Sequence, residues 1–503
     1  MDYQKLLILI SFVSASILIL ILRKLNQTQN STKLPPGPKP LPIIGNILQL
    51  GKNPHRTLTN LSNIYGPIMT LKLGTLTTIV ISSPQLAKQV LHENSQIFSN
   101  RTVPHAIHAL DHNKFSLGWL PTLALWKKLR KICATKVFST KMLDSTKNIR
   151  QQKLQVLLDY VKEKCNKGEA FDIGEAVFTT VLNSVSNTFF SMDLAHSTPD
   201  EKSQVFENIL RGLSELSGTS NIADFFPILR PLDPQRLYAK MAIHLGSLCE
   251  IIGGIIEERR ASKIDSDQVC NDVLDSLLNN DGETIFDQLS PKEMFHLLPD
   301  LFAAGIDTTS STIEWIMVEL LRNPSNMTKA RTELSKVIGK DEIIEESDIF
   351  KLPFLQAVVK ETFRLHPPAP LLVPHKCDES VNILGFNVPK NAQVIVNVWA
   401  MGRDPTIWKN PNMFMPERFL ECDINYKGNH FELIPFGAGK RICPGLSLAH
   451  RNVHLIVASL LHNFEWILAD GLKSEHMNME ERFGLSLKRV QPLRVQVTSI
   501  KHG

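Results

Sequence analysis

The segment from Phe436 to Gly445 has the residue types of a binding loop. It reads FGAGKRICPG, in which the inner glycines permit tight backbone geometry, Arg441 can contact an anion and Cys443 carries a thiol. A phosphate-binding loop is the first alternative. It fails because Lys440 is followed by arginine instead of Ser or Thr, and because the first glycine of that motif is missing. The chemistry of this segment therefore has to come from the arginine and the thiol.

A second candidate is the polar stretch AGIDTT, Ala304 to Thr309, inside an otherwise apolar helical pattern. Gly, Asp and Thr are poor residues for a helix interior, and such conflicts are expected at functional sites. A carboxylate such as Asp307 can relay protons, and a hydroxyl such as that of Thr308 can order water. A solvent-facing polar turn is the alternative, and the apolar neighbours argue against it.

Two further pairs have helical spacing. Trp126 and Arg130 lie at i,i+4 and so on one helix face, and Glu361 and Arg364 lie at i,i+3, the spacing of an ion pair. The simpler interpretations are a packed aromatic ring beside a surface arginine, and an ordinary helical ion pair. Neither pair has functional meaning on its own.

Two secondary-structure elements are well marked. Ser290, Pro291 and Glu293 form a helix start with a capping box, and the apolar pattern then runs to Asn323-Pro324. Pro299 lies inside this helix and is expected to kink or break it before the AGIDTT stretch. Partial alternation and β-branched residues around a central glycine predict a hairpin over 68–82.

Composition excludes several classes of protein. The net charge is +5 over 503 residues, and no basic run alternates with aromatic residues, so no nucleic-acid partner is expected. The seven cysteines are an odd number without a C-x-x-C pair, which argues against a disulfide framework and a structural zinc site. The chain contains no G-x-G-x-x-G, so it offers no dinucleotide-binding segment of that kind.

The N-terminus predicts a membrane anchor. Leu6 to Leu22 is uncharged and apolar, with cations on both sides, and as a helix it nearly spans a bilayer. A cleaved signal peptide is the competing interpretation. We expect an anchor at 1–25, a polar and proline-rich hinge at 26–46, and one large domain at 47–503, with the domain on the cytoplasmic side.

These segments together resemble the cytochrome P-450 family. FGAGKRICPG matches the haem-binding signature F-x-x-G-x-R-x-C-x-G, and Glu361-x-x-Arg364 precedes Pro416-Glu417-Arg418-Phe419 in the family's order. The resemblance implies a mainly α fold with small β-sheets, and haem b held by the thiolate of Cys443, which favours O–O bond cleavage. It also implies a buried charge network of Glu361, Arg364 and Arg418, and oxygen activation by Asp307 and Thr308.

Further cofactor contacts follow from the same resemblance. Trp126, Arg130 and Arg441 are implied as partners of the haem propionates, and Phe436 opens the cofactor loop. His375 stands where many members of the family carry arginine, so its contact with a propionate stays open.

The resemblance is strongest to plant microsomal enzymes of the group that contains geraniol 8-hydroxylase and related terpenoid oxidases. It rests on 119–132, 224–235 and 360–374, and it implies a mainly apolar substrate pocket at Ile107, Leu117, Ala303, Ala304, Leu372, Val373, Phe483 and Leu485. Such a pocket suits a small lipophilic substrate such as a monoterpene alcohol. A diterpene, a phenolic or an alkaloid is the alternative.

The expected activity is insertion of one oxygen atom from O₂ into a C–H bond, with electrons from an NADPH-cytochrome reductase. The expected location is the endoplasmic reticulum membrane, with a single span and a cytosolic catalytic domain. Two other functions stay open: a haem-thiolate isomerase or dehydratase that needs no external electrons, and a membrane haem carrier or sensor without turnover.

Overall fold

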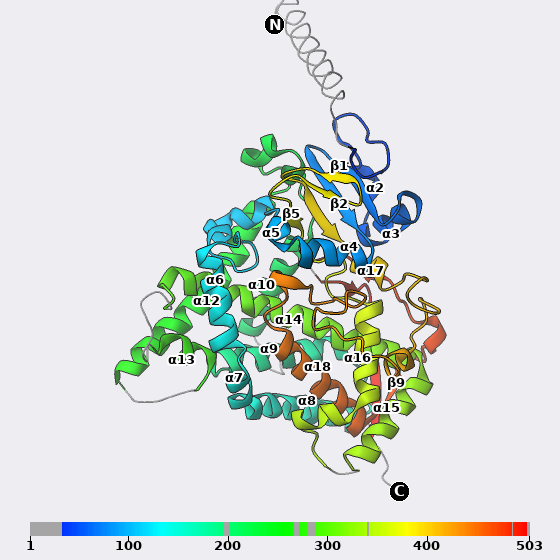
Figure 1. The fold of residues 1–503 in the computed structure, drawn as a ribbon. Helices are drawn as coiled ribbons and strands as arrows, with labels where there is room; N and C mark the ends of the chain where they lie inside the picture. The colour runs from blue at the N-terminus through cyan, green and yellow to red at the C-terminus, as the bar shows by residue number, and fades with distance from the viewer. Residues whose placement is uncertain are drawn as a thin grey trace, which may run out of the picture.

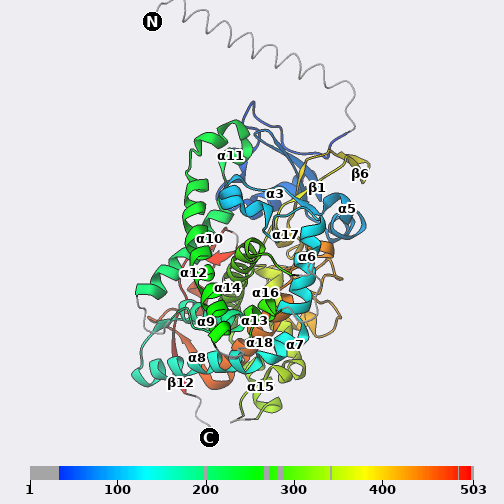
Figure 2. The ribbon, with the colours of Figure 1, turned by 90° about the vertical axis from the view of Figure 1, so that its left-hand side faces the viewer.

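The structure is a computed structural model that describes residues 33–195, 201–265, 271–279, 288–339, 342–484 and 486–499. The predicted anchor at 1–25, the first part of the predicted hinge, and the pocket candidate Leu485 lie outside the described residues. Figures 1 and 2 show a body made mainly of helices, with a small sheet at the end where the described chain begins. The fold class expected from the family resemblance, mainly α with small sheets, is confirmed.

The longer helices form the body of the domain. They are α3 (Pro54–Tyr65), α6 (Ala124–Ile132), α8 (Lys147–Lys167), α9 (Ile173–Phe190), α10 (Glu201–Gly218), α12 (Leu237–Asp265), α14 (Pro291–Arg322), α15 (Pro324–Val337), α16 (Pro353–Leu365) and α18 (Leu446–Asn463). Shorter α-helices are α2 (Ile47–Leu50), α4 (Pro84–Lys88), α5 (Ser95–Phe98), α7 (Thr140–Ser145), α11 (Ile222–Phe225), α13 (Val273–Leu278) and α17 (Val398–Met401).

Helix α14 runs through the middle of the body and packs against α9, α12, α16 and α18 (Figure 1). The predicted capping box is confirmed, because the Ser290 side chain accepts from the Glu293 backbone and the Glu293 side chain accepts from the Ser290 backbone. Most residues of α14 are buried, so its length is supported by packing on several sides.

Pro299 does not break α14, which corrects one of the two outcomes expected for it. Proline has no N–H to donate to the carbonyl four residues earlier, and an unpaired buried carbonyl is costly. Here the carbonyl of Phe295 accepts instead from the thiol of Cys249 on α12, at 3.6 Å. A donor from a neighbouring helix thus replaces the missing one, and the helix continues.

The sheets are small. The largest has the order β1-β2-β8-β5-β3, and the predicted hairpin is confirmed as β1 (Ile68–Leu73) and β2 (Leu76–Ile81), paired antiparallel with Ile68 opposite Ile81. The remaining strands are β3 (Asn100–Arg101), β4 (Phe171–Asp172), β5 (His375–Lys376), β6 (Val381–Ile383), β7 (Phe386–Val388), β8 (Gln393–Val396), β9 (Phe464–Leu468), β10 (Glu481–Arg482), β11 (Lys488–Arg489) and β12 (Arg494–Ser499).

The described part of the predicted hinge is packed against this sheet. The carbonyl of Pro36 accepts from the backbone of Thr70 at 2.8 Å, and a Cβ on Gly37 would lie 2.0 Å from the Thr70 carbonyl. Only glycine fits this close approach of two backbones. The segment from residue 33 onward is therefore part of the domain surface.

One described helix, α12, is long and apolar enough to cross a membrane, judged by length and composition over Leu237–Ser262. Its residues Leu248, Cys249 and Ile252 are fully buried in the helical core. Helix α12 also packs against α10, α14 and the 3₁₀ segment η3 (His105–Lys114). The core helix of a folded domain can have the same length and composition, so α12 by itself is not evidence of a membrane span.

Candidate active site

The cysteine loop precedes α18 and is shaped by backbone constraints. Gly437 and Gly439 have φ of 71° and 66°, a region that glycine enters without strain. A Cβ on Gly439 would lie 2.0 Å from the carbonyl of Leu91, so this position has to be glycine. The Cys443 backbone donates to the Phe436 carbonyl at 2.9 Å, which closes the loop.

The environment of Cys443 acts on its thiol in two directions. Burial raises the pKa of Cys443, while the backbone N–H of Gly445, the charge of Arg130 and the backbone N–H of Leu446 lower it. Donors aimed at sulfur stabilise a thiolate more than a thiol. Burial is the larger effect, so the pKa of Cys443 is raised on balance, and the N–H groups and Arg130 are in place to stabilise the thiolate once a metal binds the sulfur.

Half-buried cations gather beside this loop without acidic partners among the described residues. Burial lowers the pKa of Arg130, and burial with Arg130 nearby lowers the pKa of Arg441 to about 10. Arg130 donates to the carbonyl of Ile442 at 2.9 Å, and the guanidinium of Arg441 lies 4.9 Å from the ring centre of Trp126. In the described part of the chain no carboxylate forms an ion pair with either arginine. Buried cations are usually paired, so an anion belongs here.

Arg101 joins this group and was not found by sequence reasoning. Burial, and then the charge of Arg441, hold the pKa of Arg101 well below its ordinary value. Its Nε and the indole Nε1 of Trp126 are buried donors without a partner among the described residues. Position 101 carries no motif, and β3 brings it to the site by pairing with β5, where Arg101 lies opposite His375.

His375 is buried and neutral. Burial, followed by the charge of Arg101, holds its pKa well below the ordinary value, and its Nδ1 lies 2.7 Å from the carbonyl of Phe98, to which it donates as N–H. Arg101 lies opposite His375 in the β3–β5 pair, so the charged side chain at this place in the sheet comes from β3.

The oxygen-activation candidates lie at the centre of α14. Thr308 Oγ1 donates to the carbonyl of Ala304 at 2.8 Å, and Thr312 repeats this pattern with Thr308. Bonds to the carbonyl four residues earlier let hydroxyl side chains stay in a helix, which explains why the polar stretch does not end it. Ala304 is exposed and Thr308 half-buried in a helix that is otherwise covered, so the helix has an open face at these residues.

The carboxylate of Asp307 points away from Thr308. It forms an ion pair with Lys488 Nζ, at 2.6 Å from Oδ2 and 2.7 Å from Oδ1, and accepts from Ser214 Oγ. Asp307 is buried, and Ser214 comes from α10 while Lys488 comes from β11. Sequence reasoning missed both partners, because 93 and 181 residues separate them from Asp307.

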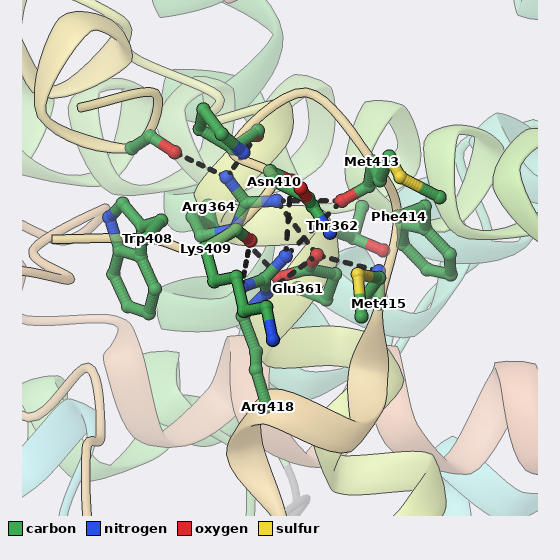
Figure 3. Close-up of polar contacts among 12 residues, drawn as sticks. Glu361, Thr362, Arg364, Trp408, Lys409, Asn410, Met413, Phe414, Met415 and Arg418 are labelled. Carbon is green, nitrogen blue, oxygen red and sulfur yellow. Dashed lines mark hydrogen bonds and ion pairs between the residues drawn. The ribbon is translucent and has the colours of Figure 1, made fainter. Parts of the chain in front are cut away.

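The predicted charge network is assembled as a unit (Figure 3). Arg364 donates to both oxygens of Glu361 at 2.7 Å, and Arg418 Nε donates to Glu361 Oε1 at 3.1 Å. The side chains of Glu361 and Arg364 are 0% exposed. Arg364 also donates to the carbonyls of Gly402, Pro411 and Met413, so the pair is hydrogen-bonded on several sides.

The predicted pocket residues are brought together only in part. Ile107 and Leu117 are buried in the helical core with Ala303 against them, while Leu372 packs on the sheet-side core. Leu372 has a φ of 51°, and Val373 accepts through its carbonyl from Arg101. Phe483 lines a cavity of about 290 Å³. Its other lining residues are Ser214, Glu215, Thr219, Arg482, Gly484, Ser486 and Lys488, so this cavity is more polar than the sequence predicted.

A half-buried cysteine, half-buried cations without acidic partners and a buried indole N–H without a partner among the described residues fit one kind of group. An iron porphyrin needs a ligand for its iron and cations for its two carboxylates, and the residues present supply both. Fold and site thus define a haem-thiolate protein.

Comparison with known proteins agrees with this class. The cytochrome P450 family model matches residues 35–494. Cytochrome P450 76T24 from Catharanthus roseus is 49% identical over 92% of this chain and 93% of its own length. Geraniol 8-hydroxylase from Swertia mussotii is 44% identical over 99% of this chain and 100% of its own, and a carnosic acid synthase from Rosmarinus officinalis is 47% identical over 92% of each.

The chain belongs to the cytochrome P450 family. Its cofactor is therefore a haem whose iron has an axial cysteine, and its reaction is that of a monooxygenase. The class of enzyme and the cofactor predicted from the cysteine loop are confirmed.

Proposed function

We propose that this enzyme hydroxylates a small lipophilic alcohol of the terpenoid class, with electrons that an NADPH-cytochrome reductase supplies at the endoplasmic reticulum. The haem supplies activation of O₂ when it is bound. Cys443 would provide the thiolate that holds its iron, and Trp126, Arg130, Arg441 and Arg101 would hold its carboxylates. Thr308 orders water, and Asp307 delivers protons from the side of Lys488.

The observation that carries the substrate class is the cavity at Phe483. Its wall joins an aromatic ring to hydroxyl groups and to the charged side chains of Glu215, Arg482 and Lys488. Ser486 Oγ is a buried hydroxyl without a hydrogen-bond partner among the described residues. A buried polar atom without a partner is costly unless a ligand or water supplies one. A lipophilic substrate with one hydroxyl group meets both requirements, and a relative that is 44% identical is named for geraniol, such an alcohol.

Support for the membrane location comes from one face of the domain. Large apolar side chains are exposed where the described chain begins, with Ile43 at 81% and Leu48 at 73%, and on η5 (Pro227–Leu232), with Ile228 at 85% and Leu232 at 74%. The turn of the β1–β2 hairpin contacts both segments. The Gly74 backbone donates to the carbonyl of Ile44 at 3.2 Å, and the Thr75 backbone donates to the carbonyl of Phe225, two residues before η5, at 2.9 Å. An apolar face next to the end of a predicted anchor is suited to the bilayer surface.

The decisive experiment supplies geraniol, a diterpene alcohol and a simple phenol to microsomes that contain the full chain and a reductase. We expect an NADPH-dependent hydroxylated product from a terpenoid alcohol. Ser486→Ala should raise KM for that alcohol and leave KM for its deoxygenated analogue unchanged. Turnover of the phenol alone would reject the terpenoid assignment.

The same assay tests the two rival functions. An isomerase or dehydratase would form product without reductase, and a haem carrier or sensor would form none with any substrate. Thr308→Ala should retain haem and still consume NADPH while peroxide replaces product. For the orientation, Asn100 begins an N-R-T sequon, and a cytosolic domain predicts that it carries no glycan.

A further inference from the structure

One carboxylate on α14 ties down the segment that leads from η3 to α6. Asp300 accepts from His112 Nε2 at 2.9 Å, from Ser116 Oγ at 2.6 Å and from the backbone N–H of Gly118. The side chains of His112 and Asp300 are 7% and 17% exposed. Three donors from seven consecutive residues thus converge on one largely buried anion, and hydrogen bonds to a charged group are the stronger kind.

The contact extends one turn back along α14. His112 Nδ1 lies 3.1 Å from His296 Nδ1, and the ring of Phe115 stacks on His296 with centres 5.1 Å apart and planes 8° apart. Burial, followed by the charge on His112, lowers the pKa of His296 to about 4, so His296 is neutral near pH 7. The other charged groups that face His296 are Asp300, Lys292 and Asp111.

The same segment is held from its other side by the cysteine loop. Arg441 donates to the carbonyls of Leu117 and Gly118 at 3.2 and 3.4 Å, and to the carbonyl of Leu120. Leu117 therefore lies between two residues bonded to Asp300, while its own carbonyl is bonded to Arg441. These bonds hold the backbone on both sides of Leu117 and so restrict where its side chain can point.

The chain needs this clamp because it turns sharply just before it. Leu110 and Asp111 have φ of 54° and 59°, a left-handed conformation that costs non-glycine residues about 1 kcal/mol or more each. Such a turn persists only where its surroundings hold it. His112 follows it directly and is bonded to Asp300.

We propose that Asp300 is a positioning residue that determines how long a substrate chain fits against Leu117. By holding residues 112–118 on α14, it fixes Leu117, which is one of the residues predicted to line the substrate pocket. The inference rests on the proposed pocket. Asp300 and Asp307 lie seven residues, about two helical turns, apart on one side of α14. The first carboxylate holds the segment that carries Leu117, and the second binds Lys488, which lines the cavity at Phe483.

The test uses Asp300→Asn in the full-length, haem-loaded enzyme. The probes are n-alkylimidazoles of increasing chain length, whose ring binds iron while the alkyl chain samples the pocket. Affinity for each is measured from the shift of the haem absorption band. We expect the chain length of highest affinity to change, with about tenfold faster hydrogen exchange at the amides of 112–118, since a hydrogen bond to a charged group is about that strong.

Matched variants separate positioning from general destabilisation. Asp111→Asn removes the ion pair with Lys114, at 3.0 Å and exposed, in the same segment and should change neither measurement. His112→Leu should act like Asp300→Asn, while His112→Gln keeps a donor for Asp300 and should restore the wild-type length profile.

Faster exchange with an unchanged alkylimidazole profile in Asp300→Asn would overturn the proposal, because the anchor would then be structural only. If Asp300→Asn does not fold with haem, His112→Leu decides in its place, and a wild-type profile there overturns the proposal. Absence of product from any terpenoid would reject the proposed substrate class, while the alkylimidazole profile would still decide the role of Asp300.

Discussion

Asp307 and Lys488 form an ion pair at 2.6 Å that links the centre of α14 to strand β11. The side chains are 9% and 18% exposed, so the pair lies between a surface salt bridge and a buried one. Lys488 also lines the cavity at Phe483. Asp307, which we propose delivers protons, is thus paired with a lysine that lines this cavity.

Lys488→Met should destabilise the fold by about 2 kcal/mol, between the values for exposed and buried pairs, because Asp307 is left without its cation. The fraction of NADPH used for product should fall as well. Urea unfolding and NADPH-to-product ratios measure both effects. In an Asp307→Asn background the same change should cost far less, and an equal cost there would show that the two side chains act independently.

Arg364→Lys should largely abolish the yield of folded, haem-loaded protein. Lysine has a single ammonium group where Arg364 donates to Glu361 through two nitrogens, and disrupting a buried pair costs about 3–5 kcal/mol. The measurement is the reduced carbon monoxide band per milligram of protein. Lys329→Met removes a surface pair with Glu417 whose side chains are 53% and 40% exposed, and it should leave that yield unchanged.

Cys249→Val should destabilise the enzyme by about 1 kcal/mol through loss of the donor to the Phe295 carbonyl. Burial raises the pKa of Cys249 to about 12, so the thiol keeps its proton across the working pH range. In a Pro299→Ala background the helix regains its own donor, and Cys249→Val should then cost less. Thermal unfolding of the wild type, of Cys249→Val, of Pro299→Ala and of the double variant gives the cost of Cys249→Val in each background. Equal costs in both backgrounds would argue that the thiol does not replace the donor that Pro299 lacks.

The free energy of unfolding should fall as pH rises from about 4.5 to about 7, because Glu314 is protonated in the folded state over this window. Burial raises the pKa of Glu314 to about 7, with Arg489 opposing, so over this window the folded state holds a proton that the unfolded state has lost. The loss amounts to about 3 kcal/mol at most. Glu314→Gln keeps the shape without the titration, so the stability difference between variant and wild type should grow with pH until about 7. A constant difference would contradict the shift.

Trp126→Phe should weaken haem retention and leave the fold intact. It removes the buried indole N–H that lacks a partner in the described chain, while the ring still packs under Arg441. Haem transfer to an acceptor protein should be about tenfold faster, because the loss of one hydrogen bond to a charged group changes a rate by about that factor. Cys443→Ser is the reference variant, in which the thiolate carbon monoxide band should disappear altogether. Unchanged transfer in Trp126→Phe would remove the indole from the haem site.

The sequence by itself determined the features that are local. The turn of the cysteine loop depends on the positive φ of Gly437 and Gly439 and on the bond from Cys443 to Phe436, all within ten residues. The start of α14 depends on Ser290 and Glu293 three residues apart, and the β1–β2 hairpin depends on alternation around one turn. In each case the interacting groups are close in the chain, so spacing and residue type are sufficient to predict the contact. The family resemblance rests on the same short motifs.

Tertiary structure decided the contacts between distant segments. Lys488 meets Asp307 across 181 residues, His112 meets Asp300 across 188, and Cys249 meets the Phe295 carbonyl across 46. Many lysines, histidines and cysteines in the chain could have filled these places, and no periodicity selects among them. Burial selects them, because a charge or carbonyl removed from water needs a partner, and only the packed helices determine which side chain is within reach.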